Sequence, residues 1–120
     1  MPIVNNDLIY EIALCLFSKI GAPEENATTL AQHLTDANLA GHDSHGIIRV
    51  MQYMKEIDEG ILNPSARPEI VQETDGSALI NGNAGFGQVV ATFATQLAIS
   101  KAKKSGISFV SMGRMGHTGR

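Results

Sequence analysis

The sequence Ser77-Ala78-Leu79-Ile80-Asn81-Gly82-Asn83-Ala84-Gly85-Phe86-Gly87-Gln88 decides the fold class, because a strand-like run leads through closely spaced glycines into a helical pattern. The surrounding pattern predicts strands at 69–74 and 77–81, a glycine loop at 82–87, a helix at 88–105 and a buried strand at 107–112. The turn residues Asp75-Gly76 between the first two strands predict a β-hairpin. This part of the chain therefore combines strands with a helix.

The chain upstream has the apolar spacing and end signals of helices. The expected helices run from Asn5 or Asn6 to Gly21, from Pro23 to Gly41, and from Asp43 or Ser44 to about Glu59. Helices followed by strands mixed with a helix predict a mixed α/β (α+β) architecture. We expect an N-terminal helical segment over residues 1–62 and the start of an α/β domain over residues 63–120, incomplete at its C-terminal end.

The glycine spacing at 82–87 argues against a Rossmann fold. Gly82, Gly85 and Gly87 follow a predicted strand and precede a predicted helix, as the dinucleotide fingerprint does. Their spacing is G-x-x-G-x-G, whereas the fingerprint is G-x-G-x-x-G. No Asp or Glu follows Asp75 to hold a ribose. The segment is therefore interpreted as a tight strand-to-helix connection in a non-Rossmann fold.

Charge is distributed unevenly along the chain. Residues 1–75 hold all twelve carboxylates and a net charge of −8, whereas residues 76–120 hold five basic groups and a net charge of +5. Either the second part faces an anion, such as a cofactor phosphate or a substrate carboxylate, or sequence downstream restores the balance. The absence of a dense basic patch with interleaved aromatic residues argues against nucleic-acid binding.

The apolar runs and the cysteine content indicate whether the chain can span a membrane, form a disulfide or suit a reducing compartment. The longest clean apolar run, residues 12–17, is too short to span a bilayer, so we expect no membrane association. Cys15 is the only cysteine, which excludes an internal disulfide. A reducing compartment is the simplest setting for such a chain, and we expect a cytoplasmic protein.

The motif Asp43-Ser44-His45-Gly46-Ile47-Ile48-Arg49, followed by Tyr53, concentrates side chains that can carry chemistry. On one continuous helix, His45, Arg49 and Tyr53 at i, i+4 and i+8 form a stripe beside the core face. That core face would consist of Ile47, Val50, Met51, Met54 and Ile57. With Ser44 at the helix start, a carboxylate would meet N–H groups, a hydroxyl and the guanidinium fork of Arg49. The alternative is a solvated face with an ordinary serine cap.

The same region allows a metal-site reading. His42, Asp43 and His45 supply donor atoms, so a metal-dependent hydrolase is an alternative. The spacing is not His-Glu-x-x-His, and three ligands in fixed geometry are not evident. We therefore expect no metal site.

A further histidine lies in Gly116-His117-Thr118-Gly119, directly after the last predicted strand. An imidazole titrates near neutrality, and flanking glycines let backbone and ligand approach closely. His117 is therefore a candidate general acid–base, the alternative being an ordinary surface-loop histidine. The chain stops three residues later in a glycine-rich loop, from which we expect the front part of a longer enzyme.

Together these motifs resemble the N-terminal third of the type-2 malate/L-lactate dehydrogenase family. The resemblance rests on Gly41-His42-Asp43-Ser44-His45-Gly46-Ile47-Ile48-Arg49 with Tyr53, on the residues 81–88, and on Gly116-His117-Thr118-Gly119. The family also includes ureidoglycolate and sulfolactate dehydrogenases, diketogulonate reductase and piperideine-carboxylate reductase. The resemblance implies the family's non-Rossmann fold, NAD or NADP as cofactor, a small 2-hydroxy or 2-oxo acid as substrate, and a homodimer.

The resemblance also implies roles for single residues. His117 would be the catalytic acid–base, and His45 a second candidate proton donor. Ser44, Arg49 and Thr118 would bind substrate, as would Tyr53. The cofactor-binding residues are unknown and expected mostly beyond Arg120, so the 120-residue chain alone is expected to be inactive. The alternatives are the metal-dependent hydrolase and a fragment with no activity of its own.

Overall fold

The computed structural model describes residues 2–119, which fall into two compact units. The first unit holds residues 2–65 together with Gly119, and the second holds Ala66–Thr118. The division falls between Ser65 and Ala66. Among the described residues, no helix has the length and apolar character needed to cross a membrane.

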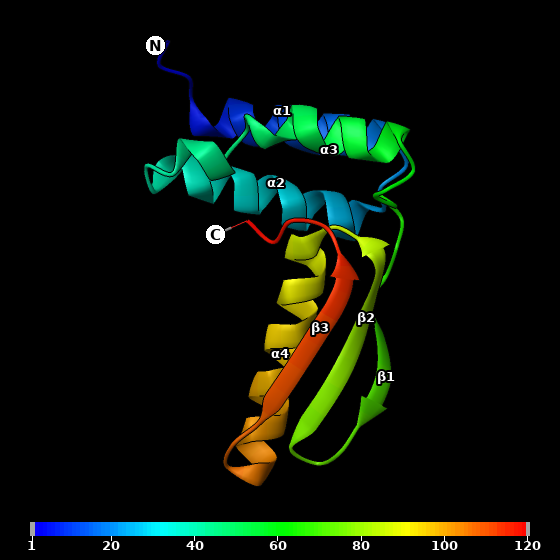
Figure 1. The fold of residues 1–120 in the computed structure, drawn as a ribbon. Coiled ribbons are helices and arrows are strands. Elements are labelled where there is room, and N and C mark those ends of the chain that lie inside the picture. Colours follow the sequence, from blue (N-terminus) through cyan, green and yellow to red (C-terminus); the bar gives the residue numbers. More distant parts are fainter. Residues whose placement is uncertain (1, 120) are drawn as a thin grey trace. The chain divides into compact units, whose positions relative to one another are not determined.

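The first unit is helical (Figure 1). It contains α1 (Asn6–Lys19), α2 (Glu24–Leu39), the short 3-10 helix η1 (Asp43–His45) and α3 (Arg49–Asp58). The predicted N-cap of α1 is confirmed, because the Asn5 side chain accepts a hydrogen bond of 2.9 Å from the Asp7 amide. Gly21 and Gly41 have φ angles of 96° and 78°, which fits their predicted places just after α1 and α2.

The prediction of one continuous third helix from Asp43 or Ser44 to Glu59 is wrong. The segment forms η1, then a turn at residues 46–48, and α3 begins only at Arg49. Neither Asp43 nor Ser44 caps α3, because its N-cap position is Ile48, which makes no side-chain capping bond. The physical reason lies at residues 46 and 47, where Gly46 leaves space for the Asn38 side chain and the Ile47 amide donates a hydrogen bond of 2.8 Å to Oδ1 of Asn38.

The second unit is a three-stranded mixed sheet with one helix (Figure 1). Its elements are β1 (Glu69–Glu73), β2 (Ser77–Gly85), α4 (Gly87–Ser105) and β3 (Phe109–Met115). The strand order is β1-β2-β3, with β1 antiparallel to β2 and β2 parallel to β3. The predicted hairpin is thus confirmed, and its turn is closed by a hydrogen bond of 2.9 Å from the Thr74 amide to the Ser77 carbonyl.

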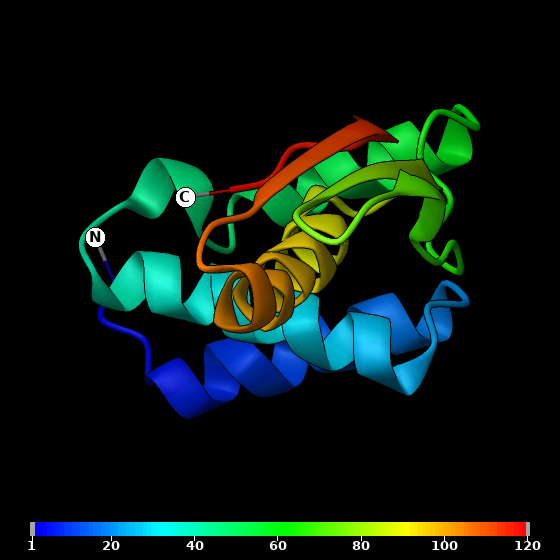
Figure 2. The same cartoon turned by 90° about the horizontal axis from the view of Figure 1, so that it is seen from below.

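The helix α4 covers one face of this sheet (Figure 2). The core between them is built on Ile80 from β2 and on Val90 and Ala94 from α4. Further half-buried apolar side chains pack against this cluster, namely Phe93, Leu97, Val110, Met112 and Met115. Leu79 and Phe109 lie on the strands but are exposed, so apolar surface of the sheet is also presented to solvent.

The prediction of a glycine loop over residues 82–87 is wrong for most of its length. Strand β2 continues to Gly85, which pairs with Met115 of β3. The register shifts between Asn81 and Gly85, where Asn83 and Ala84 adopt positive φ angles of 53° and 59°. This irregularity lets the strand bend and resume its pairing, which a loop reading of the glycines does not anticipate.

Candidate functional site

Ser44, His45 and Arg49 are brought together in the first unit. The Ser44 hydroxyl oxygen lies 3.0 Å from Nδ1 of His45, within hydrogen-bond distance. Nε of Arg49 donates a hydrogen bond of 2.7 Å to the carbonyl oxygen of Ser44. The guanidinium is therefore fixed to the backbone of the turn that carries the hydroxyl and the imidazole.

A second bond fixes the plane of the Arg49 guanidinium. Its Nη1 donates to Oε1 of Gln52 at 2.6 Å, and Nε2 of Gln52 donates to Oε1 of Glu56 at 2.7 Å. These side chains follow one another along α3, so the helix itself sets their spacing. A planar guanidinium held at two points is suited to bind a carboxylate in a defined orientation.

Tyr53, the third residue of the predicted stripe, lies on the buried side of α3. Its side chain is 1% exposed, and its ring centroid lies 6.4 Å from that of Phe17. Met51, predicted to be core, is 77% exposed instead. The buried face of α3 is thus rotated toward Tyr53, because the tyrosine ring is a large apolar surface despite its hydroxyl.

His117 and Thr118 lie in the second unit, in the segment that follows β3. Both are partly exposed. The start of this segment is held by a hydrogen bond of 2.9 Å from the Gly116 amide to the Gly85 carbonyl. At the start of α4, Gly87 lies so close to the backbone of Gly116 and His117 that a Cβ atom would not fit. The last residues of β2 and the first residue of α4 therefore position the backbone of His117.

The same contact tests whether the 82–87 segment fits a dinucleotide. In a glycine fingerprint, the pyrophosphate approaches the backbone where the strand turns into the helix. Here the backbone of Gly116 and His117 occupies the space against Gly87. The segment does not fit a pyrophosphate in that manner, and we assign no cofactor-binding residue in the described part of the chain.

The metal-site alternative finds no support in the structure. Across residues 2–119, no group of three His, Cys, Asp or Glu side chains is arranged to hold a metal ion. The carboxylate of Asp43, one of the three suggested ligands, accepts a hydrogen bond of 2.8 Å from Nδ2 of Asn38.

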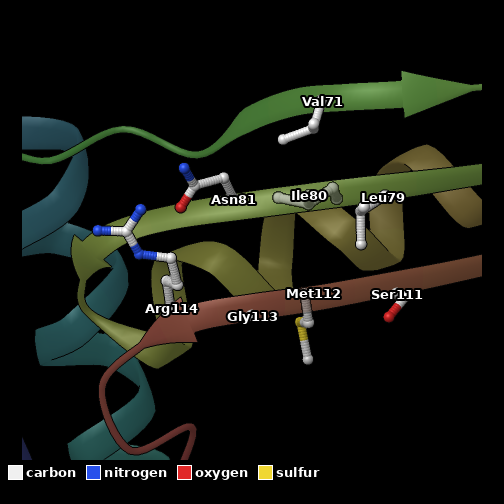
Figure 3. Close-up of a pocket in the computed structure, with 8 residues that line it drawn as sticks. All are labelled: Val71, Leu79, Ile80, Asn81, Ser111, Met112, Gly113 and Arg114. Carbon is white, nitrogen blue, oxygen red and sulfur yellow. The ribbon is translucent and has the colours of Figure 1, made fainter.

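Two open hollows lie near these elements, and neither gathers the predicted site residues. One, of about 640 Å³ in the first unit, is bordered by Ser44 but not by His45 or Arg49. The other, of about 340 Å³, lies on the sheet (Figure 3). Figure 3 shows Asn81 and Arg114 pointing toward one another at one end of it. Its remaining walls are mostly apolar, and none of its lining residues is a histidine or a carboxylate.

Sequence reasoning missed three residues that shape these groups. Gln52 orients Arg49, Asn38 holds the turn at 43–47, and Gly87 makes room for the His117 backbone. The spacing of Gln52 from Arg49 on a helix was a usable signal, since residues three apart are neighbours on a helix surface. Asn38 and Gly87 act on residues distant in sequence, so no local pattern identifies them.

Comparison with known proteins agrees with the order of these elements. The family model described as malate/L-lactate dehydrogenase matches residues 4–120. A malate dehydrogenase of Pyrococcus abyssi is 38% identical over 97% of this chain and 32% of its own length. A ureidoglycolate dehydrogenase (NAD(+)) of Escherichia coli O157:H7 is 31% identical over 97% of this chain and 33% of its own length.

A solved structure extends the agreement to three dimensions. The sulfolactate dehydrogenase of Methanocaldococcus jannaschii superposes with a TM-score of 0.95 at 37% identity, covering 98% of this chain and 34% of that one. The chain thus spans about a third of the length of these relatives. Its helices followed by a mixed sheet and helix correspond to the N-terminal third of such structures. Because the family model matches nearly the whole chain, the chain belongs to the malate/L-lactate dehydrogenase family.

Proposed function

We propose that the complete protein containing this chain is an NAD(P)-dependent oxidoreductase that interconverts a small 2-hydroxy acid and the corresponding 2-oxo acid. The observation that carries the proposal is the guanidinium of Arg49, fixed by the Ser44 carbonyl and by Gln52 beside the Ser44–His45 pair. Malate, ureidoglycolate and sulfolactate, after which three relatives are named, are all carboxylates with a hydroxyl on the neighbouring carbon.

Substrate binding is assigned to the first unit. The guanidinium of Arg49 donates paired hydrogen bonds to the substrate carboxylate, and the Ser44 hydroxyl donates a further one. The bonds to the Ser44 carbonyl and to Gln52 orient the fork before the substrate arrives, which lowers the entropy cost of binding. Tyr53 lies on α3, is 1% exposed and has its ring centroid 6.4 Å from that of Phe17, so we assign it a packing role in place of the direct substrate contact expected from the sequence.

Proton transfer is assigned to His117, with Thr118 beside it as a substrate contact. In oxidation, neutral His117 takes the proton of the C2 hydroxyl as the C2–H bond breaks and a C2 carbonyl forms. In reduction, protonated His117 returns that proton to the C2 oxygen. NAD or NADP, when bound, supplies or accepts the hydride at the same carbon. His45, held by Ser44, is the second candidate for the proton-donor role.

The test is oxidation of NADH and NADPH by the complete protein with a panel of 2-oxo acids. The 2-oxo acids are pyruvate, oxaloacetate, oxalurate, sulfopyruvate and 2,3-diketogulonate, and the cyclic imine piperideine-2-carboxylate is assayed beside them. We expect turnover with at least one acid, and we expect His117→Ala to lower kcat by about 10²–10⁴-fold, the usual effect of a positioned acid–base. His45→Ala is expected to lower kcat less than His117→Ala does.

His42→Ala is the matched control, because His42 is an exposed histidine in the same motif and has no role in the proposal. We expect His42→Ala to keep wild-type turnover, whereas a hydrolase centred on His42, Asp43 and His45 would lose its activity. A folded, complete protein that turns over none of the acids would contradict the proposed function. Normal kcat in His117→Ala, with chemistry rate-limiting, would contradict the role of His117.

We also propose that the complete protein is a homodimer, which light scattering after size-exclusion chromatography tests directly. A monomeric mass at the concentrations of the activity assay would contradict it. The 120-residue chain by itself is expected to show no turnover, because it spans only about a third of the length of the dehydrogenases that it matches.

A further inference from the structure

The side chain of Asn38 connects both ends of the turn that carries Ser44 and His45. Its Nδ2 donates a hydrogen bond of 2.8 Å to Oδ1 of Asp43, and its Oδ1 accepts one of 2.8 Å from the amide of Ile47. Asn38 lies in the last turn of α2, so its backbone is held by a helix. A single carboxamide thus fixes the turn on either side of the hydroxyl and the imidazole.

Gly46 makes this arrangement possible. A Cβ atom on Gly46 would lie 2.5 Å from Nδ2 of Asn38 and would also overlap its Oδ1 and Cγ atoms. The φ angle of Gly46 is −91°, outside the left-handed region, and the missing side chain leaves the space that the Asn38 carboxamide occupies. Gly46 is buried, which agrees with a close contact between its backbone and the carboxamide.

The same turn also holds the side chain of Arg49. The carbonyl oxygen of Ser44, between the two Asn38 contacts, is the acceptor for Nε of Arg49 at 2.7 Å. A shift of the turn therefore shifts the anchor of the guanidinium as well as the Ser44–His45 pair. Through this series of contacts, Asn38 controls the position of side chains that it does not itself touch.

We propose that Asn38 is a positioning residue for the carboxylate-binding group, acting on Arg49 and on the Ser44–His45 pair through the turn. This inference rests on the proposed function for its kinetic consequence. The bond to the Ile47 amide is the essential one, because it is partly buried and fixes the backbone, whereas the bond to Asp43 joins exposed side chains. A replacement that keeps the oxygen acceptor at position 38 therefore preserves the positioning.

The kinetic test compares Asn38→Ala with Asn38→Asp in the complete protein. Asn38→Ala is expected to raise KM for the 2-oxo acid about tenfold, the effect of roughly one hydrogen bond. KM for NADH or NADPH and the Tm stay near wild type, because Asn38 is partly exposed and alanine suits a helix. Asn38→Asp keeps an oxygen for the Ile47 amide but sets a carboxylate against that of Asp43, so it is made together with Asp43→Asn, and the KM for the 2-oxo acid is then expected to stay within about threefold of wild type.

Gln32→Ala is the matched control. Gln32 is an exposed amide on α2, and its Nε2 donates a 2.8 Å hydrogen bond to Asp36, away from the turn. This variant loses a similar amide–carboxylate bond on the same helix, and all its kinetic constants are expected to stay at wild-type values.

A second measurement does not depend on activity. Hydrogen exchange of the complete protein, followed by mass spectrometry, reports on the peptide that contains Ile47. We expect faster exchange of that peptide in Asn38→Ala, with no change in a peptide covering β3. Gly46→Ala is expected to accelerate exchange at the same place, and to add less when Asn38→Ala is already present, because the overlapping partner has then been removed.

The outcomes separate this inference from the proposed function. Unchanged KM and unchanged exchange in Asn38→Ala overturn the positioning role while leaving the dehydrogenase proposal intact. The KM for the 2-oxo acid and the KM for NADH or NADPH could instead rise equally, with a lower Tm, in Asn38→Ala and in the Asn38→Asp double variant alike. That result would show a merely structural role for Asn38 and would also overturn the positioning role. A wild-type protein without turnover would contradict the proposed function. The exchange data would then still show whether Asn38 holds the turn.

Discussion

A Cβ atom placed on Gly87 would lie 2.5 Å from the carbonyl carbon of His117, so the backbones of these two residues meet with no space for a side chain. Gly87 is the first residue of α4, and His117 follows β3. Only two residues before Gly87, the Gly85 carbonyl accepts a hydrogen bond of 2.9 Å from the Gly116 amide. The proposed acid–base is thus positioned by residues about thirty positions earlier in the chain.

Gly87→Ala is therefore expected to displace the His117 segment and to lower kcat. A displacement of about 1 Å in a catalytic group can cost about 10²-fold in rate. KM for the 2-oxo acid should change much less, because carboxylate binding is assigned to Arg49. Steady-state kinetics of the complete protein would measure both constants.

Gly113→Ala is the control for this substitution. Gly113 lies on β3, and a Cβ atom there would meet no atom within 4 Å. Wild-type kinetics in Gly113→Ala together with a low kcat in Gly87→Ala would support the positioning of His117 by Gly87. An equal loss in both variants would instead indicate a general sensitivity of this strand and helix to added bulk.

Substitutions of Tyr53 separate the effect of its buried ring on stability from any effect of its hydroxyl on substrate binding. Tyr53→Ala is expected to destabilise the protein by about 3–5 kcal/mol, because it leaves a cavity beside Phe17. Tyr53→Phe keeps the ring, and at 1% exposure the hydroxyl is not placed to meet a ligand. We therefore expect Tyr53→Phe to leave KM for the 2-oxo acid within about threefold of wild type, and urea unfolding together with kinetics would measure the two effects.

The opposite result would restore the role expected from the sequence. A large rise in KM for Tyr53→Phe, with the free energy of unfolding unchanged, would mean that the hydroxyl reaches the substrate after all. Phe17→Leu serves as the companion variant, because it disturbs the same ring contact from α1 without touching any proposed substrate group.

Most of the secondary structure could be predicted because its signals are local. The Asn5 cap, the glycines after α1 and α2, and the hairpin turn at residues 74–77 each depend on residues within a few positions. The register of β2 could not be predicted in this way. It depends on pairing with β3 across α4, and on a positive φ angle at Ala84, which alanine only rarely adopts, directly after a positive φ angle at Asn83.

The candidate site shows the same contrast. Ser44, His45 and Arg49 could be selected from the sequence by residue type and spacing, and the structure brings them together. The helical wheel failed for Tyr53 because it counted the residue as polar and took the helix to start before Gly46. Asn38 stands nine positions before Ile47, and no periodicity links a carboxamide at the end of one helix to a turn before the next.

Lys101 is expected to stabilise the second unit. Its Nζ lies 2.9 Å from Oε2 of Glu73 and donates a 2.6 Å hydrogen bond to the Thr74 carbonyl, while its side chain is only 12% exposed. Because the Glu73 side chain is 52% exposed, solvent screens the ion pair, and we expect Lys101→Met to cost only about 1 kcal/mol. Urea unfolding measures the loss. The exposed neighbour Lys103→Met is the control, and an equal loss there would remove the special role of Lys101.

Arg49→Lys separates the shape of the guanidinium from its charge. A lysine keeps the positive charge but has a single nitrogen, so it cannot bond the Ser44 carbonyl and Gln52 while offering a fork to a carboxylate. We expect KM for the 2-oxo acid to rise about tenfold in Arg49→Lys and about a hundredfold in Arg49→Ala. In both variants kcat should fall less than KM rises, because the carboxylate does not react.

Gln52→Leu completes the series, because it removes only the acceptor that orients Nη1 of Arg49. The charge and the fork remain, so KM for the 2-oxo acid should rise by only about threefold, less than in Arg49→Lys. Lys55→Leu, an exposed position on the same helix, controls for added apolar surface on α3. If Arg49→Lys had the wild-type KM, a point charge would suffice at this position. The geometry built by Ser44, Gln52 and Glu56 around the guanidinium would then have no part in substrate binding.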